Sequence, residues 1–268
     1  MCRTLGMSRQ NYYKSRKNRQ RKQFDQTLIL SLVSRERSLQ PNLGCRKLLK
    51  LIRPDLSEAG VCIGRDSFFK VMSEQQLLIK RRKRSVTTTN SRHRFKVYGN
   101  LVKDIDITES HQVLVSDITY IRTDEGFVYL SLVMDAYSRK IVGYDCSDSL
   151  EAEGCLRSLN QAIRQLPAGH STIHHSDRGS QYCCHAYVET LKSFGLSISM
   201  TEENHCYENA QAERLNGILK QEYELDQTFK SKSASYAAIN QAIHLYNTHR
   251  PHQALNYQIP ERVHGNAA

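Results

Sequence analysis

Three acidic residues stand where a carboxylate could do chemistry. Asp117 interrupts an alternating apolar run, Asp177 directly follows a second short run, and Glu213 lies in a long helical pattern. A carboxylate inside a strand is costly to bury without a partner, and ligand sites of sheets favour strand ends. Hard oxygen ligands suit Mg²⁺ or Mn²⁺, and a pair of such ions can activate the attacking oxygen and stabilise the leaving oxygen at a phosphodiester. The three residues are therefore candidate metal ligands and catalytic residues.

The helical pattern around Glu213 has two faces. At about 100° per residue, Asn209, Asn216, Gly217 and Lys220 fall within about 60° of Glu213, and the opposite face is apolar. A carboxylate, amides and a lysine would thus share one side. An ordinary amphipathic surface helix gives the same split, so this helix alone leaves both interpretations open.

The elements that must carry these residues follow from hydrophobic periodicity. The patterns predict, in order, strands over 111–121, 127–135 and 140–146, a helix over 151–166, a strand over 171–175, a helix over 180–194, a strand over 196–200 and a helix over 207–223. This order predicts an α/β fold, a ribonuclease-H-like core with a mixed five-stranded sheet and covering helices.

The region before this core is helical and basic. Apolar spacing predicts helices over 24–37, 44–52 and 66–78, with Pro54 ending the second, and residues 5–14 look like a turn and a short helix start. Short connections in a basic context indicate a small all-α helix-turn-helix domain that binds DNA. A three-helix bundle without a ligand is the alternative.

Charge divides the chain in the same place. The formal net charge is +11; residues 1–103 hold 25 − 6 = +19 and residues 104–268 hold 13 − 21 = −8. A basic front favours a polyanionic partner, and a merely solvated basic face is the alternative. The run Lys80, Arg81, Arg82, Lys83 and Arg84 leads into a polar stretch that can lie along phosphates.

These observations predict four regions: a basic DNA-binding region over 1–84, a linker over 85–105, a catalytic core over 106–230 and a C-terminal helical tail over 231–268. No stretch approaches the roughly 20 apolar residues of a membrane span, and the first residues lack a signal-peptide core. The eight cysteines form no C-x-x-C pair, and the histidines and cysteines at 174–185 fit no common zinc spacing. We expect a cytoplasmic protein with reduced thiols.

Three blocks of the core resemble a known family. They are Val-Ser-Asp-Ile-Thr-Tyr-Ile at 115–121, His-Ser-Asp-Arg-Gly-Ser-Gln-Tyr at 175–182, and 209–220, which contains Glu213; 35 residues (178–212) separate the last two acidic positions. They resemble the DDE integrase core. The segment 246–255 with Pro260, and the front segments 44–47 and 87–91, resemble bacterial insertion-sequence transposases of the OrfB type.

The resemblance implies the catalytic subunit of a DNA transposase, a polynucleotidyl transferase that cleaves transposon ends and joins them to target DNA. It implies two Mg²⁺ (or Mn²⁺) ions, with Asp117 bridging both and Asp177 and Glu213 completing one each. Arg178, Asn216 and Lys220 become candidate DNA contacts, with the basic run at 80–84. Arg178 could instead be a charge partner, and His249, Arg250 and His252 could contact DNA or cap the fold.

The resemblance also implies partners: the terminal inverted repeats, target DNA, further copies of the chain on DNA, and an upstream reading frame supplied as a partner or by fusion. Without that fusion, the alternative is a DNA-binding regulator or repressor of transposition that does not catalyse. The protein would be nucleoid-associated in the bacterial cytoplasm.

Two positions depart from the family pattern. Leu114 stands where the family has Trp, and Glu208 where it has Asp; we expect these to tune packing or DNA contact. The front lacks the zinc-module spacing of retroviral-type integrases. A ribonuclease H or junction resolvase shares the expected fold, but it would explain neither the helix-turn-helix front nor the block at 246–255.

Overall fold

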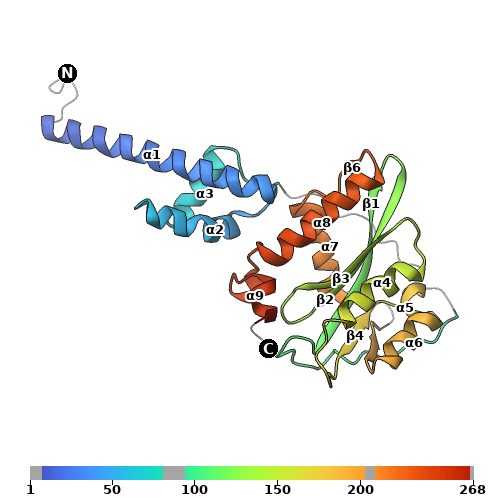
Figure 1. Ribbon diagram of the computed structural model, residues 1–268. Helices are drawn as coiled ribbons and strands as arrows, with labels where there is room; N and C mark the ends of the chain where they lie inside the picture. Colours follow the sequence, from blue (N-terminus) through green and yellow to red (C-terminus); the bar gives the residue numbers. More distant parts are fainter. Residues whose placement is uncertain (1–7, 81–93, 203–208, 266–268) are drawn as a thin grey trace. The chain divides into compact units, whose positions relative to one another are not determined.

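The computed structural model describes residues 8–80, 94–202 and 209–265. The chain divides into two units, Met1–Arg81 and Arg82–Ala268 (Figure 1). In the described ranges, no helix combines the length and the apolar character that crossing a membrane would require.

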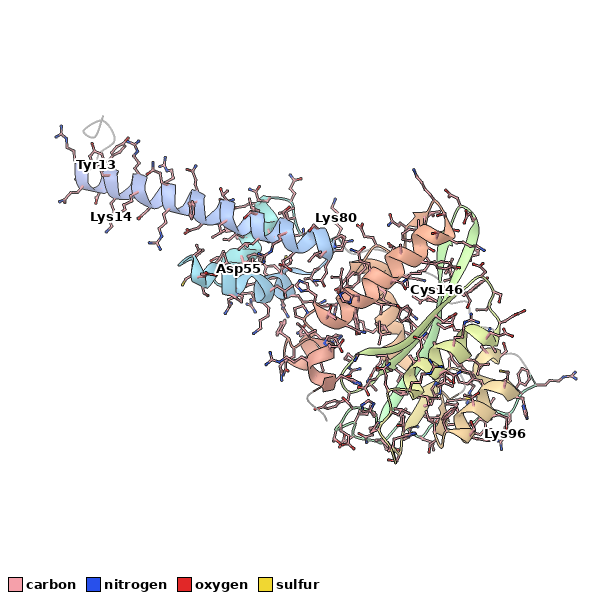
Figure 2. All side chains as sticks on the ribbon, viewed as in Figure 1. Tyr13, Lys14, Asp55, Lys80, Lys96 and Cys146 are labelled. Atoms are coloured by element: carbon pink, nitrogen blue, oxygen red, sulfur yellow. The ribbon has the colours of Figure 1, made fainter. Side chains whose placement is uncertain are left out.

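The first unit consists of α1 (Arg9–Leu39), α2 (Cys45–Glu58) and α3 (Arg65–Glu74). Ser8 caps α1 by accepting a hydrogen bond from the backbone N–H of Asn11 at 3.2 Å. The three helices share one core, which includes Ile29, Val33, Leu48, Ile52, Phe68 and Met72. Residues 9–23 of α1 lie outside this core and are almost all exposed; Figure 2 shows Tyr13 and Lys14 on this stretch, pointing away from the helix.

The predicted helices of this unit exist, but their bounds differ. α1 already begins at Arg9, because most residues of its first half are Arg, Lys or Gln, which form helices well without an apolar period. α2 continues past Pro54 to Glu58, because Leu56 is buried in the core beyond the proline. α3 ends at Glu74, since Gln76 adopts a φ of 56° and the N–H of Leu77 bonds the carbonyl of Met72 at 2.8 Å.

The second unit is built on a mixed sheet. In the described part of the chain it has six strands, in the order β3-β2-β1-β4-β5 with β6 also paired to β1. β1 pairs antiparallel with β2 and parallel with β4 and β6. The strands are β1 (Val113–Thr123), β2 (Gly126–Asp135), β3 (Ile141–Ser147), β4 (Ile173–Ser176), β5 (Ser197–Met200) and the two-residue β6 (Thr228–Phe229), which the sequence did not indicate.

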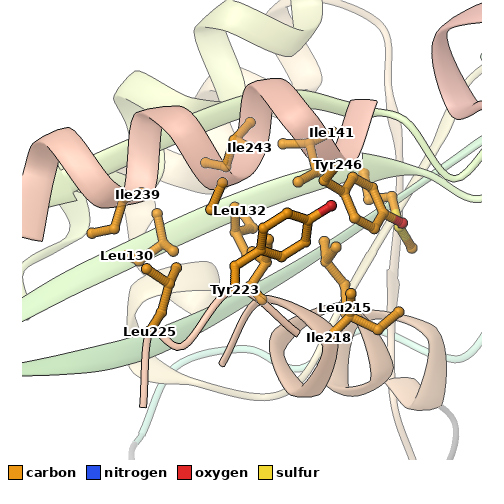
Figure 3. Close-up of a cluster of buried hydrophobic side chains, with 14 of the residues drawn as sticks. Leu130, Leu132, Ile141, Leu215, Ile218, Tyr223, Leu225, Ile239, Ile243 and Tyr246 are labelled. Carbon is orange, nitrogen blue, oxygen red and sulfur yellow. The ribbon is translucent and has the colours of Figure 1, made fainter. Parts of the chain in front are cut away.

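Helices cover the two faces of the sheet with separate apolar clusters. α7 (Ala210–Glu222) and α8 (Lys232–Thr248) pack on one face, where Figure 3 shows Leu215, Ile218, Ile239 and Ile243 meeting strand residues such as Leu130 and Leu132. α4 (Ala152–Ile163), α5 (Ser180–Cys183) and α6 (His185–Ser193) pack on the other. The helix predicted over 180–194 is thus two helices, because Cys184 is extended, with a ψ of 152°.

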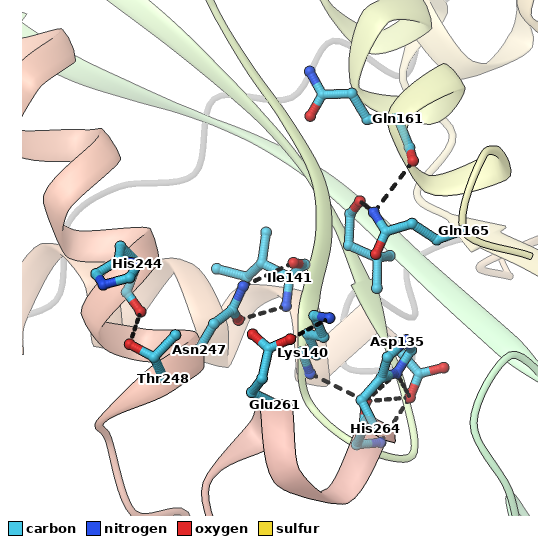
Figure 4. Close-up of polar contacts among 12 residues, drawn as sticks. Asp135, Lys140, Ile141, Gln161, Gln165, His244, Asn247, Thr248, Glu261 and His264 are labelled. Atoms are coloured by element: carbon cyan, nitrogen blue, oxygen red, sulfur yellow. Dashed lines mark hydrogen bonds and ion pairs between the residues drawn. The ribbon is translucent and has the colours of Figure 1, made fainter. Parts of the chain in front are cut away.

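The end of the chain is tied to the sheet by polar contacts (Figure 4). Asn247 in α8 exchanges two hydrogen bonds of 2.9 Å with the backbone of Ile141, as a neighbouring strand would. After the 3-10 turn Gln253–Leu255, the short helix α9 (Pro260–Gly265) brings Glu261 to within 2.8 Å of the Lys140 ammonium. Segment 231–265 therefore shares the core and edge of the sheet.

Candidate active site

The register of two parallel strands brings Asp117 and Asp177 to the same part of the sheet. β1 and β4 pair up to Val115↔His175, and each aspartate is the second residue after that pair. β4 ends at Ser176, so Asp177 stands at its carboxyl end, whereas β1 continues along β2. Ligand sites of sheets containing parallel strands gather at such ends.

Asp117 lies beneath α7 and is only partly compensated. Its Oδ2 accepts a hydrogen bond from Asn216 Nδ2 at 2.7 Å, and its Oδ1 accepts one from the N–H of Ile118 at 2.9 Å. Burial, the negative charge of Asp177 and, more weakly, that of Glu213 raise the pKa of Asp117 to about 8. Asp177 and Glu213 are therefore both close enough to Asp117 to repel its negative charge.

Asp177 is held by the loop between β4 and α5. Its Oδ1 accepts the N–H of Gly179 at 2.9 Å. A Cβ at position 179 would stand 3.0 Å from that same oxygen and 3.2 Å from Gln181 Oε1, so a residue without a side chain allows the loop to fold closely around the carboxylate. The neighbouring Arg178 donates from Nε to the carbonyl of Thr201 at 2.6 Å.

Glu213 is exposed in the first turn of α7, where the helix dipole favours negative charge. Asn216 follows on the same helix but is buried against Asp117. Lys220 holds its Nζ 4.5 Å from the ring centroid of Tyr120, and burial lowers the pKa of this lysine. Lys80 is exposed in the first unit, and Arg81, Arg82, Lys83 and Arg84 lie outside the described residues.

The donor atoms at this site fit a hard cation. All are oxygens, and the amide oxygens Asn209 Oδ1 and Asn216 Oδ1 are buried without a hydrogen-bond partner in the described structure. The arrangement is nevertheless open. In the described ranges, no three His, Cys, Asp or Glu residues lie close enough together to hold an ion by themselves.

The sequence did not indicate a buried polar network at Ser116, the residue that precedes Asp117 in β1. Ser116 Oγ lies 2.8 Å from His174 Nε2, and Tyr187 Oη lies 2.9 Å from the same nitrogen. Burial lowers the pKa of His174 to about 3, so its ring is neutral. Asn209 Nδ2 donates to the carbonyl of Ser116 at 3.1 Å. Only the strand register reveals that these residues meet.

Arg250 has a structural role in this fold. Its side chain is 1% exposed, pairs with Glu222 at 2.8 and 3.0 Å, and lies 5.5 Å from the ring centroid of Tyr246. These contacts favour capping of the fold over contact with DNA for this residue.

Family models and relatives agree with this arrangement. Two models described as "Integrase core domain" match residues 107–206 and 194–260, which include all three candidate carboxylates. The chain is 33% identical to the "Insertion element IS600 uncharacterized 31 kDa protein" of Shigella sonnei over the full length of both. It is 31% identical to the "Transposase for insertion sequence element IS629" of Shigella sonnei, over 81% of this chain and 72% of that one.

The chain is also similar to a relative below 30% identity and to a solved structure. "Transposase InsF for insertion sequence IS3A" of Escherichia coli (strain K12) is 29% identical over 98% of this chain and 92% of its own. The solved HTLV-2 integrase catalytic core domain in complex with magnesium (trimeric form) is 18% identical, with a TM-score of 0.46, over 57% of this chain and 96% of that one.

The predicted fold is confirmed by the integrase-core matches together with the mixed sheet and the preceding helical unit. Integrase-core proteins are metal-dependent, act on DNA and oligomerise. The relatives above 30% identity and the core matches show that the chain belongs to the insertion-sequence transposases of the DDE integrase superfamily and is a catalytic DNA transposase.

Proposed function

We propose that Asp117, Asp177 and Glu213 are the catalytic carboxylates of this transposase and that together they hold Mg²⁺ or Mn²⁺, two ions in each active site. The observation that carries this proposal is the register Val115↔His175, which brings both aspartates to one part of the sheet, with α7 packed against β1. Oxygen-only donors, and the raised pKa of Asp117 beside two other carboxylates, support the choice of cation.

Each carboxylate has its own task in this proposal. Asp117 would contribute to both ions, because it feels the charge of both other carboxylates, and Asn216 orients it. Asp177, which is fixed by the Gly179 N–H, and the exposed Glu213 would each contribute to one ion. Bound cations would activate the attacking oxygen and stabilise the leaving oxygen. Water would first attack a phosphodiester at a transposon end and break its bond to the 3′-oxygen, which leaves as a free 3′-OH while the other strand end keeps a 5′-phosphate. This 3′-OH would then attack a phosphodiester of target DNA, lose its proton, and displace the target 3′-oxygen as a new 3′-OH.

DNA near the active site would meet Lys220, Arg178 and the amide of Asn216. Lys220 is the strongest candidate, because it lies on the Glu213 side of α7 and its ammonium stands over the ring of Tyr120, with Asp117 and Asp226 acting on it only as nearby charges. Arg178 is already bonded to the Thr201 carbonyl through Nε, and Asn216 to Asp117. These two would therefore act mainly by shaping the surface.

The first unit would supply a second contact with DNA, through its phosphates. Arg46, Lys50 and Arg53 on α2 are exposed and share one helix face by their i, i+4, i+7 spacing. No ion pair involves them within the described residues. On α3, by contrast, Arg65 pairs with Asp66 at 2.8 Å and Lys70 lies 4.0 Å from Glu74. This α2 stripe of Arg46, Lys50 and Arg53 was not predicted from the sequence, and its exposed positive charges suit a polyanion.

We assign DNA binding to 1–84, with Lys80 and the following run at its end, a linker to 85–105, the chemistry to 106–230 and a supporting tail to 231–268. The substrates are the terminal inverted repeats and target DNA, and several copies assemble on DNA in the bacterial cytoplasm. An upstream reading frame supplies a partner or fusion. The alternative is that the chain, when it is not fused to that frame, binds DNA as a regulator of transposition and does not catalyse.

The test is an incubation with Mg²⁺ and labelled DNA carrying the ends that flank its own gene, beside Asp177→Asn. Metal-dependent nicking or joining at those ends, absent from the variant, is the expected result. Equal cleavage by Asp177→Asn would refute the assignment of the carboxylates. Binding without cleavage would favour the regulator, and a repeat with the upstream frame fused would separate that reading from a missing partner.

A further inference from the structure

Ser116 joins the three elements that carry the proposed catalytic carboxylates. It is 1% exposed and directly precedes Asp117 in β1. Its Oγ meets His174 Nε2 on β4 at 2.8 Å, and its carbonyl accepts from Asn209 Nδ2, at the start of α7, at 3.1 Å. His174 is three residues before Asp177, and Asn209 is one helical turn before Glu213.

Asn209 bonds to the Ser116 carbonyl instead of capping its own helix. It is the N-cap residue of α7, where an asparagine oxygen normally accepts an N–H from the first turn, yet its side chain makes no capping hydrogen bond. Its amide instead donates across to β1, and its Oδ1 is buried without a partner in the described structure. A residue that forgoes capping and leaves a buried acceptor unpaired is held by its tertiary contact.

We propose that Ser116 is a positioning residue that sets the spacing of Asp117, Asp177 and Glu213, through His174 on one side and Asn209 on the other. The inference rests on the proposed metal site. Side chains alternate along β1, so Ser116 reaches toward the α6 side of the sheet while Asp117 faces α7. Its hydroxyl therefore fixes β1 against β4 without touching the carboxylates, and its carbonyl fixes where α7 starts.

Comparing the affinities for Mg²⁺ and Ca²⁺ distinguishes a positioning role of Ser116 from a role in fold stability alone. Mg²⁺ requires near-ideal octahedral geometry, whereas Ca²⁺ accepts six to eight oxygens in flexible arrangements. Carboxylates displaced by a fraction of an ångström should lose Mg²⁺ affinity while keeping most of their Ca²⁺ affinity. A general loss of stability would weaken both alike.

The experiment uses the full chain and titrates Mg²⁺ and Ca²⁺ calorimetrically without DNA. Ser116→Ala should weaken Mg²⁺ binding by about 10-fold or more, as loss of a group supporting metal ligands commonly does, and leave Ca²⁺ within about 3-fold. Ser116→Thr, which keeps the hydroxyl, should recover Mg²⁺ binding. Asn209→Ser should behave like Ser116→Ala, because a serine can cap α7 but its side chain is too short to reach β1.

The matched control is Ser131→Ala. Ser131 is a strand serine, 4% exposed, on β2 opposite Ile118 of β1, but its Oγ lies 3.5 Å from Cys155 Sγ of α4 and so bonds to none of the three carboxylate-bearing elements. It should bind both cations like the wild type. Thermal unfolding of every variant establishes that it is folded before titration.

The outcomes distinguish this inference from the metal site on which it rests. If Asp117→Asn abolishes Mg²⁺ binding while folded Ser116→Ala keeps the wild-type Mg²⁺ to Ca²⁺ preference, the positioning role of Ser116 is wrong and the metal site stands. If Asp117→Asn binds Mg²⁺ like the wild type, the metal site itself is wrong. A Ser131→Ala variant that loses Mg²⁺ preference as strongly as Ser116→Ala would also overturn the inference.

Discussion

Asp117 and Asp135 are two carboxylates of the same pair of strands, and their surroundings are opposite. Asp135 is fully buried at the end of β2; its Oδ2 accepts the N–H of His111 at 2.6 Å, and its Oδ1 accepts the N–H and hydroxyl of Ser138 at 2.7 and 2.6 Å. Asp117 has the Ile118 N–H and an amide as donors; its charged neighbours are the carboxylates of Asp177 and Glu213, which raise its pKa, and the ammonium of Lys220. The fold satisfies the charge of Asp135 with three donors and compensates that of Asp117 only in part, as the proposed metal site requires.

The basic side chains show the same contrast between charges that the fold pairs and charges that it leaves exposed. Arg250 is buried and paired in bidentate fashion with Glu222, so it holds α7 and the end of α8 together. Arg46, Lys50 and Arg53 are exposed on α2 and no ion pair engages them within the described residues. Charge that the fold compensates supports structure, and charge that it leaves open is available to a metal ion or a nucleic acid.

The largest expected effect is that of Asp117→Asn on catalysis. Removing one anionic ligand should lower strand transfer by about 10³-fold or more, because the developing charge loses its preorganised electrostatic environment. DNA affinity should stay within about 2-fold, since the basic surfaces are intact. Gel assays of strand transfer and of binding with labelled end DNA measure both; strand transfer at the wild-type rate would remove Asp117 from the mechanism.

Asp135→Asn should have the opposite profile. One carboxylate oxygen becomes a donor facing the N–H of His111 or the donors of Ser138, and a buried unsatisfied group of this kind costs about 1–3 kcal/mol in the free energy of unfolding. Chemical denaturation measures the loss. A variant as stable as the wild type would mean that the hydrogen bonds of Asp135 do not stabilise the fold.

The pH dependence of stability sharpens the contrast. In metal-free protein the Asp117 carboxyl keeps its proton up to its raised pKa of about 8, whereas in the unfolded chain it ionises near its ordinary pKa, about 4. The folded state binds more protons between these values, so the free energy of unfolding contributed by this group falls as pH rises from about 4 to about 8.

Asp117→Asn should remove that slope and stabilise the metal-free protein at pH 8 by up to a few kcal/mol, since one pKa unit corresponds to about 1.4 kcal/mol. Denaturation of wild type and variant in chelator at pH 5 and pH 8 gives the difference directly. Parallel pH profiles would show that the charges around Asp117 are compensated.

The smallest effect concerns the α2 stripe. Replacing Arg46, Lys50 and Arg53 by alanine should weaken DNA binding by roughly 10-fold at moderate salt and reduce the slope of log affinity against log salt by about 2.7, for three lost phosphate contacts. The matched control replaces Arg65 and Lys70 of α3, whose charges face acidic neighbours. Equal slopes for the two variants would place the contact elsewhere.

Much of this fold could be read from periodicity. Alternation in 111–121 identified the strand of Asp117, and the helical wheel placed Asn216 and Lys220 on the side of Glu213. Tertiary contacts decided the rest. The break at Cys184, the extension of α2 past Pro54 and the two-residue β6 are held by packing and pairing that a local pattern does not contain.

The site followed the same division. Residue type, spacing and the family resemblance singled out the three carboxylates as candidates, because motifs, strand positions and helix faces are local properties of the sequence, and their catalytic role stays a prediction. The hydrogen bonds around the site could not be predicted from the sequence. Ser116 meets His174 only through the parallel register of β1 and β4, and the amide of Asn216 bonds to Asp117 only because α7 packs on the sheet. Asp135 also ends an apolar strand, and the sequence alone does not reveal that its charge is satisfied.

The most direct test of the account is the effect of Mg²⁺ on the free energy of unfolding at pH 8, for wild type and Asp117→Asn. A ligand at about 100 times its dissociation constant stabilises the folded state by about 2.7 kcal/mol. We expect the wild type to gain such stability with Mg²⁺, and the variant to be the more stable of the two in chelator but to gain nothing from the ion. A variant that responds to Mg²⁺ as the wild type does would contradict the claim that Asp117, with Asp177 and Glu213, forms the metal site.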